Sequence, residues 1–145
     1  WLEPFAKAGA DILTIHIEAE TNIRESIKII KGLGLKVGLS IKPSTPENTL
    51  EKYMELCDLI LVMTVNPGFG GQKFMNTQLD KIRKIKNMKS KAGLSFDIEV
   101  DGGVNKDTSK LCIEAGANVL VAGSAIFSEN KNNYSSLINL LRNNS

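Results

Sequence analysis

The sequence of 145 residues predicts an α/β fold, a (β/α)8 TIM barrel of which about five βα units are present. Short segments rich in Val, Ile and Leu alternate with helical patterns, which indicates parallel strands joined by right-handed crossovers. Strand starts near residues 12, 35, 59, 96 and 118 lie about 22 to 37 residues apart, as in a repeated βα unit. Glycine clusters follow the last three strands, at the ends where barrel active sites are built.

Strands and helices alternate along the whole chain. The predicted strands are short, apolar and rich in β-branched residues, and they span 11–19, 35–42, 58–65, 95–101 and 118–124. The chain starts inside a helix, and the next helix follows the N-cap candidates Thr21 and Asn22. Its apolar face carries three isoleucines, Ile23, Ile27 and Ile30. We expect the third helix to open at Thr45 and Pro46, an N-cap followed by proline at the first helical position.

Two helical patterns follow in the second half of the chain. One places Leu79, Ile82 and Ile85 on a single face, and the other opens at Asn105. The second of these ends in AGAN (115–118), which repeats the AGAD of 8–11. In both, glycine is expected to take the left-handed conformation that ends a helix before a strand.

A doubly wound parallel sheet is the alternative fold, since five βα units also suit it in length. The barrel is favoured because phosphate-type loops follow successive strands, and a short apolar turn at 125–127 comes after the last. In a doubly wound sheet the ligand crevice would lie at one switch point. Residues 1–145 are expected to form a single domain.

The segment TVNPGFGGQKF, residues 64–74, predicts an anion site. It contains three glycines within four residues, which let main-chain N–H groups turn toward one point. A helix starts just beyond it and adds the positive end of its dipole. An apolar strand, a glycine cradle and a helix together indicate a phosphate site.

Acidic side chains alternate along the strand at 95–101. Asp97, Glu99 and Asp101 share one face, opposite Ile98 and Val100, so the carboxylates point into the barrel if the aliphatic pair packs on helices. Asp101 lies at the carboxyl end and is the candidate acid/base or metal ligand. The alternative is a capping aspartate that bonds the N–H groups of its own turn. Asp97 and Glu99, lower in the barrel, are expected to form structural ion pairs.

Other side chains are expected inside the barrel near the strand ends. His16 and Glu18 alternate on the first strand, and such a pair is more typical of hydrogen-bonded structure than of catalysis. Lys42, at the end of the second strand, is a candidate partner for one of the acids at 95–101. Met63 is either part of the core or an apolar lid over a substrate.

Composition bears on the class of protein. The chain is 42% hydrophobic and 23% charged with a net charge of +2, which gives no electrostatic argument for nucleic acid or membrane surfaces. No apolar run approaches the roughly 20 residues of a membrane-spanning helix. Cys57 and Cys112 are expected to be reduced structural thiols in a cytoplasmic protein. One helix is expected to carry a solvated basic face, made of Lys81, Arg83, Lys84, Lys86, Lys89 and Lys91.

These motifs closely resemble those of ribulose-phosphate 3-epimerases. The resemblance rests on the segments at 64–74, EVDGGVN (99–105), VAGSAIF (121–127), ADILTIHIEA (10–19) and the Lys-Pro-Ser-Thr-Pro stretch (42–46), and it covers essentially the whole chain. It implies an isomerase that interconverts D-ribulose 5-phosphate and D-xylulose 5-phosphate in the pentose phosphate pathway. It also implies two aspartates on opposite faces of the sugar, which move the C3 proton through a metal-stabilised enediolate.

The resemblance assigns roles to single residues. Asp101 matches the metal-binding aspartate that also acts as one acid/base. Met63 matches a methionine that caps the apolar side of the site. The residues that match the phosphate and substrate loops are Gly68, Phe69, Gly70, Gly71, Gly102, Gly103, Gly123 and Ser124. One divalent metal ion is implied, with zinc first and iron, manganese or cobalt as alternatives.

The match departs from the family at the first strands. The family's other acid/base aspartate and two metal-binding histidines lie on its second and third strands, and the single histidine here, His16, matches the fourth. We therefore expect this chain to contain strands 4 to 8 of a barrel, and we expect these 145 residues to be inactive by themselves. An open sheet of this kind exposes two edges and an apolar face. We expect it to be unstable, to aggregate or to be completed by other chains.

The expected partner is a sugar-phosphate substrate, without nucleic acid or membrane, and a homo-oligomer is expected. Two alternative functions remain open at this point. One is another phosphate-binding barrel enzyme, such as an allulose-phosphate 3-epimerase. The other is a non-catalytic truncated homologue that binds a sugar phosphate or a partner protein.

Overall fold

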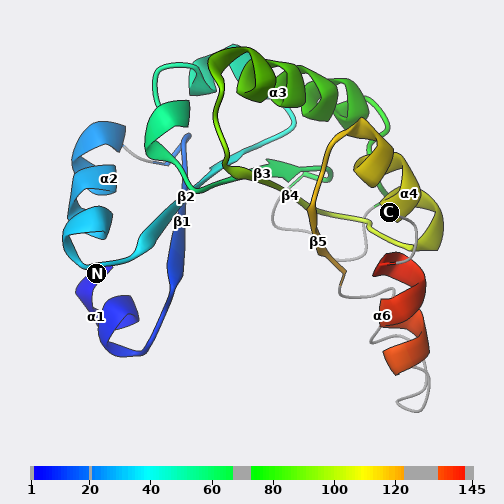
Figure 1. Cartoon of the computed structure of the whole chain (residues 1–145), viewed down its shortest axis with the longest axis horizontal. Coiled ribbons are helices and arrows are strands. Elements are labelled where there is room, and N and C mark those ends of the chain that lie inside the picture. Colours follow the sequence, from blue (N-terminus) through cyan, green and yellow to red (C-terminus); the bar gives the residue numbers. More distant parts are fainter. Residues whose placement is uncertain (1, 20, 67–72, 123–133, 143–145) are drawn as a thin grey trace.

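A curved parallel sheet is the centre of the molecule (Figure 1). The computed structural model describes residues 2–19, 21–66, 73–122 and 134–142. Within these residues the sheet has five strands, namely β1 (Ile12–His16), β2 (Lys36–Ile41), β3 (Leu59–Met63), β4 (Asp97–Asp101) and β5 (Val119–Val121). All neighbouring pairs are parallel, and each strand lies beside the next one along the chain. This order has no switch point, so the described strands do not form the doubly wound sheet considered above.

The helices lie along the outer, convex side of the curved sheet, where α2, α3 and α4 follow one another (Figure 1). The α-helices of the described part are α1 (Leu2–Lys7), α2 (Ile23–Gly32), α3 (Gln78–Ala92), α4 (Lys106–Ala115) and α6 (Tyr134–Arg142). Two short 3-10 helices, η1 (Glu47–Leu50) and η2 (Met54–Leu56), connect β2 to β3. No helix among the described residues is long and apolar enough to cross a membrane.

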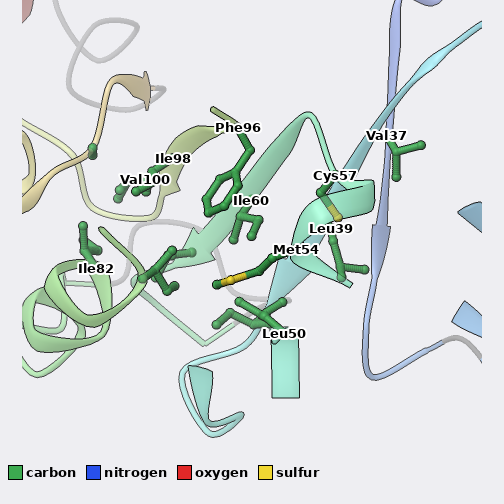
Figure 2. Close-up of a cluster of buried hydrophobic side chains, with 14 of the residues drawn as sticks. Val37, Leu39, Leu50, Met54, Cys57, Ile60, Ile82, Phe96, Ile98 and Val100 are labelled. Atoms are coloured by element: carbon green, nitrogen blue, oxygen red, sulfur yellow. The ribbon is translucent and has the colours of Figure 1, made fainter. Parts of the chain in front are cut away.

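The core lies between the convex face of the sheet and these helices. Figure 2 shows its centre, where Ile60, Ile98 and Val100 of the strands meet Leu50, Met54 and Ile82. All six are at most 4% exposed. Burial alternates along β1 and β4, so the residues between the buried ones face the concave side. This confirms that Ile98 and Val100 pack on helices while the acids of β4 face inward.

The pairing register arranges the concave face in layers. One layer crosses all five strands and contains His16, Ser40, Leu61, Glu99 and Val119. The layer above it, at the carboxyl ends, contains Met63, Asp101 and Val121. The parallel register of β3 and β4 therefore brings Met63 beside Asp101.

Two of the predicted helix starts, at Asn22 and Asn105, are confirmed. The side chain of Asn22 accepts a hydrogen bond from the Glu25 N–H and caps α2. Asn105 caps α4 through a reciprocal capping box with Thr108. The expected α-helix at Thr45 is wrong, because Pro46 is extended and a 3-10 helix begins at Glu47. The hydroxyl of Thr45 donates instead to the Glu18 carboxylate.

The prediction for the basic face of α3 fails at its first residue. Lys81 is only 7% exposed, and its Nζ donates to the main-chain carbonyls of Lys42 and Pro43 at 3.0 and 2.9 Å. It therefore ties α3 to the segment after β2. Arg83 pairs with Asp80 and Lys84 with Glu47, both through exposed basic side chains.

Both cysteines are buried and free, as predicted. Burial raises the pKa of each thiol to about 11. The neighbouring carboxylate of Asp58 adds to the shift at Cys57. Thiols with such high pKa values are poor nucleophiles near neutral pH, which fits a structural role.

Candidate active site at the ends of β3 and β4

Asp101 is the last residue of β4 and lies on the concave face, partly buried. No described group donates a hydrogen bond to its carboxylate, whereas its main-chain carbonyl accepts one from the Thr64 N–H at 2.9 Å. The capping alternative is therefore not what the described structure contains. A carboxylate at the carboxyl end of a barrel-type strand lies where barrel active sites are built, and the catalytic role of Asp101 stays a prediction.

Thr64 joins the end of β3 to the turn after Asp101. Its side chain is fully buried, and its Oγ1 lies 3.1 Å from the Asp101 carbonyl oxygen and 2.5 Å from that of Gly102. Its own carbonyl accepts a hydrogen bond from the Met75 N–H at 2.8 Å. Three segments that lie apart in the sequence, 63–65, 74–75 and 101–103, are thus bonded at one residue.

Gly102 and Gly103 pack against this junction. Both have positive φ angles, +129° and +68°. A Cβ on Gly102 would lie 2.7 Å from a methyl carbon of Val65, and one on Gly103 would lie 2.6 Å from the Phe74 nitrogen. No side chain fits at either position, so the two glycines are required by close backbone packing as well as by conformation.

Met63 occupies the same layer as Asp101 on the neighbouring strand. It is partly buried on the concave face, so its thioether is not part of the core on the helix side. The role of Met63 as an apolar lid over a substrate stays a prediction.

The other two acids of β4 do not form the expected ion pairs. Asp97 accepts a hydrogen bond from the Asn118 side-chain amide at 2.7 Å. Glu99 lies one layer below Asp101, and burial, together with the charge of Asp101, raises the pKa of its carboxyl group. Among the described side chains, neither acid has a cationic partner within ion-pair distance.

Lys42 also departs from its expected role, because it pairs with none of the acids of β4. Its main-chain N–H donates instead to the Glu18 carboxylate at 2.9 Å. Burial raises the pKa of Glu18, but the hydrogen bonds from Lys42 and Thr45 and the nearby Lys42 charge outweigh it, so the net pKa is lowered. Glu18 therefore holds the ends of β1 and β2 together.

His16 behaves as the structural alternative predicts. Its Nδ1 and the Ser40 hydroxyl lie 2.6 Å apart, within hydrogen-bond distance, across β1 and β2. Ser40 is fully buried, so this pair stabilises the sheet and does not present a nucleophile.

Several predicted ligand-binding residues lie outside the described part of the chain. They are Gly68, Phe69, Gly70, Gly71, Gly123 and Ser124. Their expected roles stay predictions. Sequence reasoning also missed Thr64, although a polar residue directly after a buried apolar strand is a signal that a main-chain partner is needed.

The described residues do not form a metal site. Nowhere in residues 2–19, 21–66, 73–122 and 134–142 do three His, Cys, Asp or Glu side chains converge. Asp101 offers one oxygen ligand, but a divalent transition metal needs several. The metal implied by the resemblance therefore remains a prediction.

A cavity of about 740 Å³ lies elsewhere, between α4, β5 and α6. It is lined mainly by apolar side chains such as Ile113, Leu120 and Ile138 and does not include Asp101 or Met63. This cavity contains no carboxylate or other acid/base group among its lining residues. The chemistry therefore points to the end of β4.

Known proteins match this chain over most of its length. The model of the ribulose-phosphate 3 epimerase family matches residues 1–127. The ribulose-phosphate 3-epimerase of Bacillus subtilis is 51% identical over 130 residues, which cover 89% of this chain and 60% of the relative. That of Synechocystis sp. is 47% identical over 145 residues, which cover 99% of this chain and 62% of the relative.

The fold has solved counterparts. The 3-hexulose-6-phosphate synthase from Salmonella typhimurium superposes with a TM-score of 0.72 at 21% sequence identity, over 99% of this chain and 67% of that one. At this identity the match shows the fold alone, which is that of TIM-barrel enzymes. The chain spans about three fifths of the length of the two epimerases above.

Proposed function

The chain belongs to the ribulose-phosphate 3-epimerase family, and from this premise we propose that it serves the interconversion of D-ribulose 5-phosphate and D-xylulose 5-phosphate. The five strands of the described residues correspond, in this proposal, to strands 4 to 8 of a (β/α)8 barrel. These 145 residues would supply one wall of the active site and be inactive alone. The observation that carries the proposal is the Asp101 carboxylate, which accepts no hydrogen bond from described groups at the carboxyl end of β4.

The reaction inverts a carbon next to a carbonyl. A base removes the C3 proton, the electrons move onto the carbonyl oxygen as an enediolate, and an acid returns a proton on the opposite face. Asp101 serves one face of the sugar as base in one direction and acid in the other. A second group is needed for the other face, and the described residues supply no second carboxylate in the layer of Asp101.

The surroundings of Asp101 support this role. Met63 offers an apolar surface beside the reacting carbon, which excludes water from the enediolate. The turn at Gly102 and Gly103 keeps main chain, without side chains, next to the carboxylate. We assign phosphate binding to the glycine segments at 68–71 and 123–124 on the resemblance of their sequences.

The finer properties are part of the same proposal. The enzyme acts in the cytoplasm in the pentose phosphate pathway, as a homo-oligomer, with a single divalent metal of which zinc is the first candidate. Because Asp101 alone cannot hold a metal, the remaining ligands come from side chains other than those described here.

The proposal is tested with Asp101→Asn in the natural full-length chain. Epimerisation of ribulose 5-phosphate should fall by roughly 10²–10⁴-fold, since an amide cannot take up the C3 proton. The matched control is Asp97→Asn, the same change on the same face of β4, which should keep most of the rate. Near-normal turnover of Asp101→Asn would exclude Asp101 from proton transfer.

Substrate choice separates the alternatives. A wild-type chain that acts on allulose 6-phosphate but not on ribulose 5-phosphate would be the hexulose enzyme. A chain that binds these sugar phosphates in calorimetry but exchanges no C3 proton with D2O would be a non-catalytic homologue. Either result overturns the proposed reaction.

A further inference from the structure

We propose that Thr64 is a positioning residue of the active site, which holds Asp101 and the turn after it in the geometry that proton transfer needs. The inference rests on the proposed function for its reaction. It goes beyond that function because the Thr64 side chain is fully buried and would act only through its bonds to Asp101 and Gly102.

The first argument is the number of bonds that meet at Thr64. Its N–H donates to the Asp101 carbonyl at 2.9 Å, and its hydroxyl reaches the same oxygen and that of Gly102. Its carbonyl receives the Met75 N–H at 2.8 Å. The Thr64 hydroxyl is fully buried and lies against two main-chain carbonyls. Breaking these hydrogen bonds would leave buried polar groups unpaired and lower the stability of the fold, so the bonds restrain the two carbonyls.

The second argument is that Asp101 stands at the last rung of the ladder between β3 and β4. Its strand partner there is Met63, and beyond that pair the chain turns at two glycines with positive φ angles. Glycines lose more conformational freedom on folding than other residues, so a turn made of them needs bonds from outside to stay in one conformation. Thr64 supplies such bonds on one side, and the Thr108 hydroxyl bonds the Gly103 carbonyl at 2.9 Å on the other.

The third argument is the required accuracy. Reacting atoms must lie about 3–3.5 Å apart, and an error near 1 Å can cost about 10²-fold in rate. Among the residues that the structure describes, no group donates a hydrogen bond to the Asp101 carboxylate. Its position therefore follows its main chain, which Thr64 bonds.

The test uses Thr64→Val, which keeps the shape and removes the hydroxyl, and Thr64→Ser, which keeps the hydroxyl. Both are made in the natural full-length chain and assayed with ribulose 5-phosphate. We expect Thr64→Val to lower kcat by at least about tenfold with little change in KM, and Thr64→Ser to restore most of kcat. The control is Thr49→Val, which removes a hydroxyl of η1 that donates to the Pro46 carbonyl and should leave kcat unchanged. Thr64→Ala gives the same comparison if Thr64→Val does not fold.

Hydrogen exchange gives a readout that needs no reaction. The amide hydrogen at position 64 should exchange at least about tenfold faster in Thr64→Val than in the wild type. The Asp97 amide, which donates to the Asp58 carbonyl elsewhere in the sheet, should exchange at the wild-type rate. A kcat for Thr64→Val close to the wild type, or a Thr64→Ser as impaired as Thr64→Val, would overturn the positioning role. If the wild type shows no epimerisation, the proposed function fails, and the exchange result alone then decides whether Thr64 holds the Asp101 turn.

Discussion

Gly103 and Phe74 are in main-chain contact: a Cβ on Gly103 would lie only 2.6 Å from the Phe74 nitrogen and 2.9 Å from its Cα. The two residues belong to different loops, one after β4 and the other before α3. Because backbone cannot move aside as a flexible side chain can, this contact admits only glycine. The turn that carries Asp101 is therefore packed directly on the segment after β3.

Replacing Gly103 by alanine should be strongly destabilising. The matched control is Gly93→Ala, since Gly93 has nearly the same φ angle, +65° against +68°, but nothing within 4 Å of its Cβ position. Gly93→Ala should cost about 1–2 kcal/mol of unfolding free energy from backbone strain alone. Gly103→Ala should cost about 1–3 kcal/mol more because of the clash, measured by urea unfolding of the full-length chain. Equal losses would mean that Phe74 can move away.

Removal of the buried ammonium of Lys81 should leave two acceptors without a donor. Lys81→Met deprives the Lys42 and Pro43 carbonyls of their hydrogen bonds and should lower the unfolding free energy by about 1–3 kcal/mol. Lys84→Met is the control on the same helix, where an exposed ammonium 3.3 Å from Glu47 contributes less than about 1 kcal/mol. If Lys81→Met lowered the unfolding free energy no more than Lys84→Met does, the hydrogen bonds of the Lys81 ammonium would not be needed for stability, and water would have to donate to the two carbonyls in its place.

The carboxylate of Glu18 should contribute stability that disappears in acid. Its pKa is lowered below the ordinary value near 4.5, so below about pH 4.5 the unfolded chain binds more protons than the folded one. Stability from Glu18 is thus present at neutral pH and lost as pH falls through the folded pKa. Because the side chain is exposed, the effect should be about 1 kcal/mol or less.

Urea midpoints between pH 3 and pH 7, roughly the range that spans this titration, test the prediction. Glu18→Gln should be less stable than the wild type at pH 7, and the difference should shrink toward the acid end. The control is Glu51→Gln, at an exposed glutamate, whose urea midpoints should follow the same pH dependence as those of the wild type. A Glu18→Gln curve parallel to the wild type would show that the bonds to Lys42 and Thr45 add no stability.

These 145 residues expressed alone should not behave as a stable monomer. The edge strands β1 and β5 carry Ile12 and Val121 on the concave face, 40% and 38% exposed. Unpaired parallel edges and exposed apolar side chains favour association. Light scattering after size exclusion should show oligomers or aggregates, and Val121→Lys should reduce them. A monomer with one cooperative urea transition would contradict the prediction.

Local patterns predicted much of the fold correctly. Strand positions and inward-facing acids followed from alternation, since a residue's side of the sheet depends only on its neighbours in sequence. The caps at Asn22 and Asn105 followed from their side chains, which bond N–H groups two or three residues away. The place of Asp101 at the end of its strand was predicted in the same way, and its role stays a prediction.

Side-chain partners were predicted poorly. Lys81 looked like part of a solvated helix face but bonds two carbonyls beyond β2, and Lys42 pairs with none of the β4 acids. Thr45 looked like an N-cap but bonds Glu18. In each case the partner lies more than 20 residues away, so no local pattern contains it.

The amino-acid sequence by itself determined the alternation of strands and helices and the buried face of each strand, because periodicity acts between near neighbours in the chain. Only the tertiary structure decided the strand order without a switch point, the pairing of Met63 with Asp101 and the bonds of Thr64 to the turn at Gly102. These depend on where the crossovers place segments that are distant in the chain. The candidate acid/base was therefore readable from the sequence, but the residue that holds it was not.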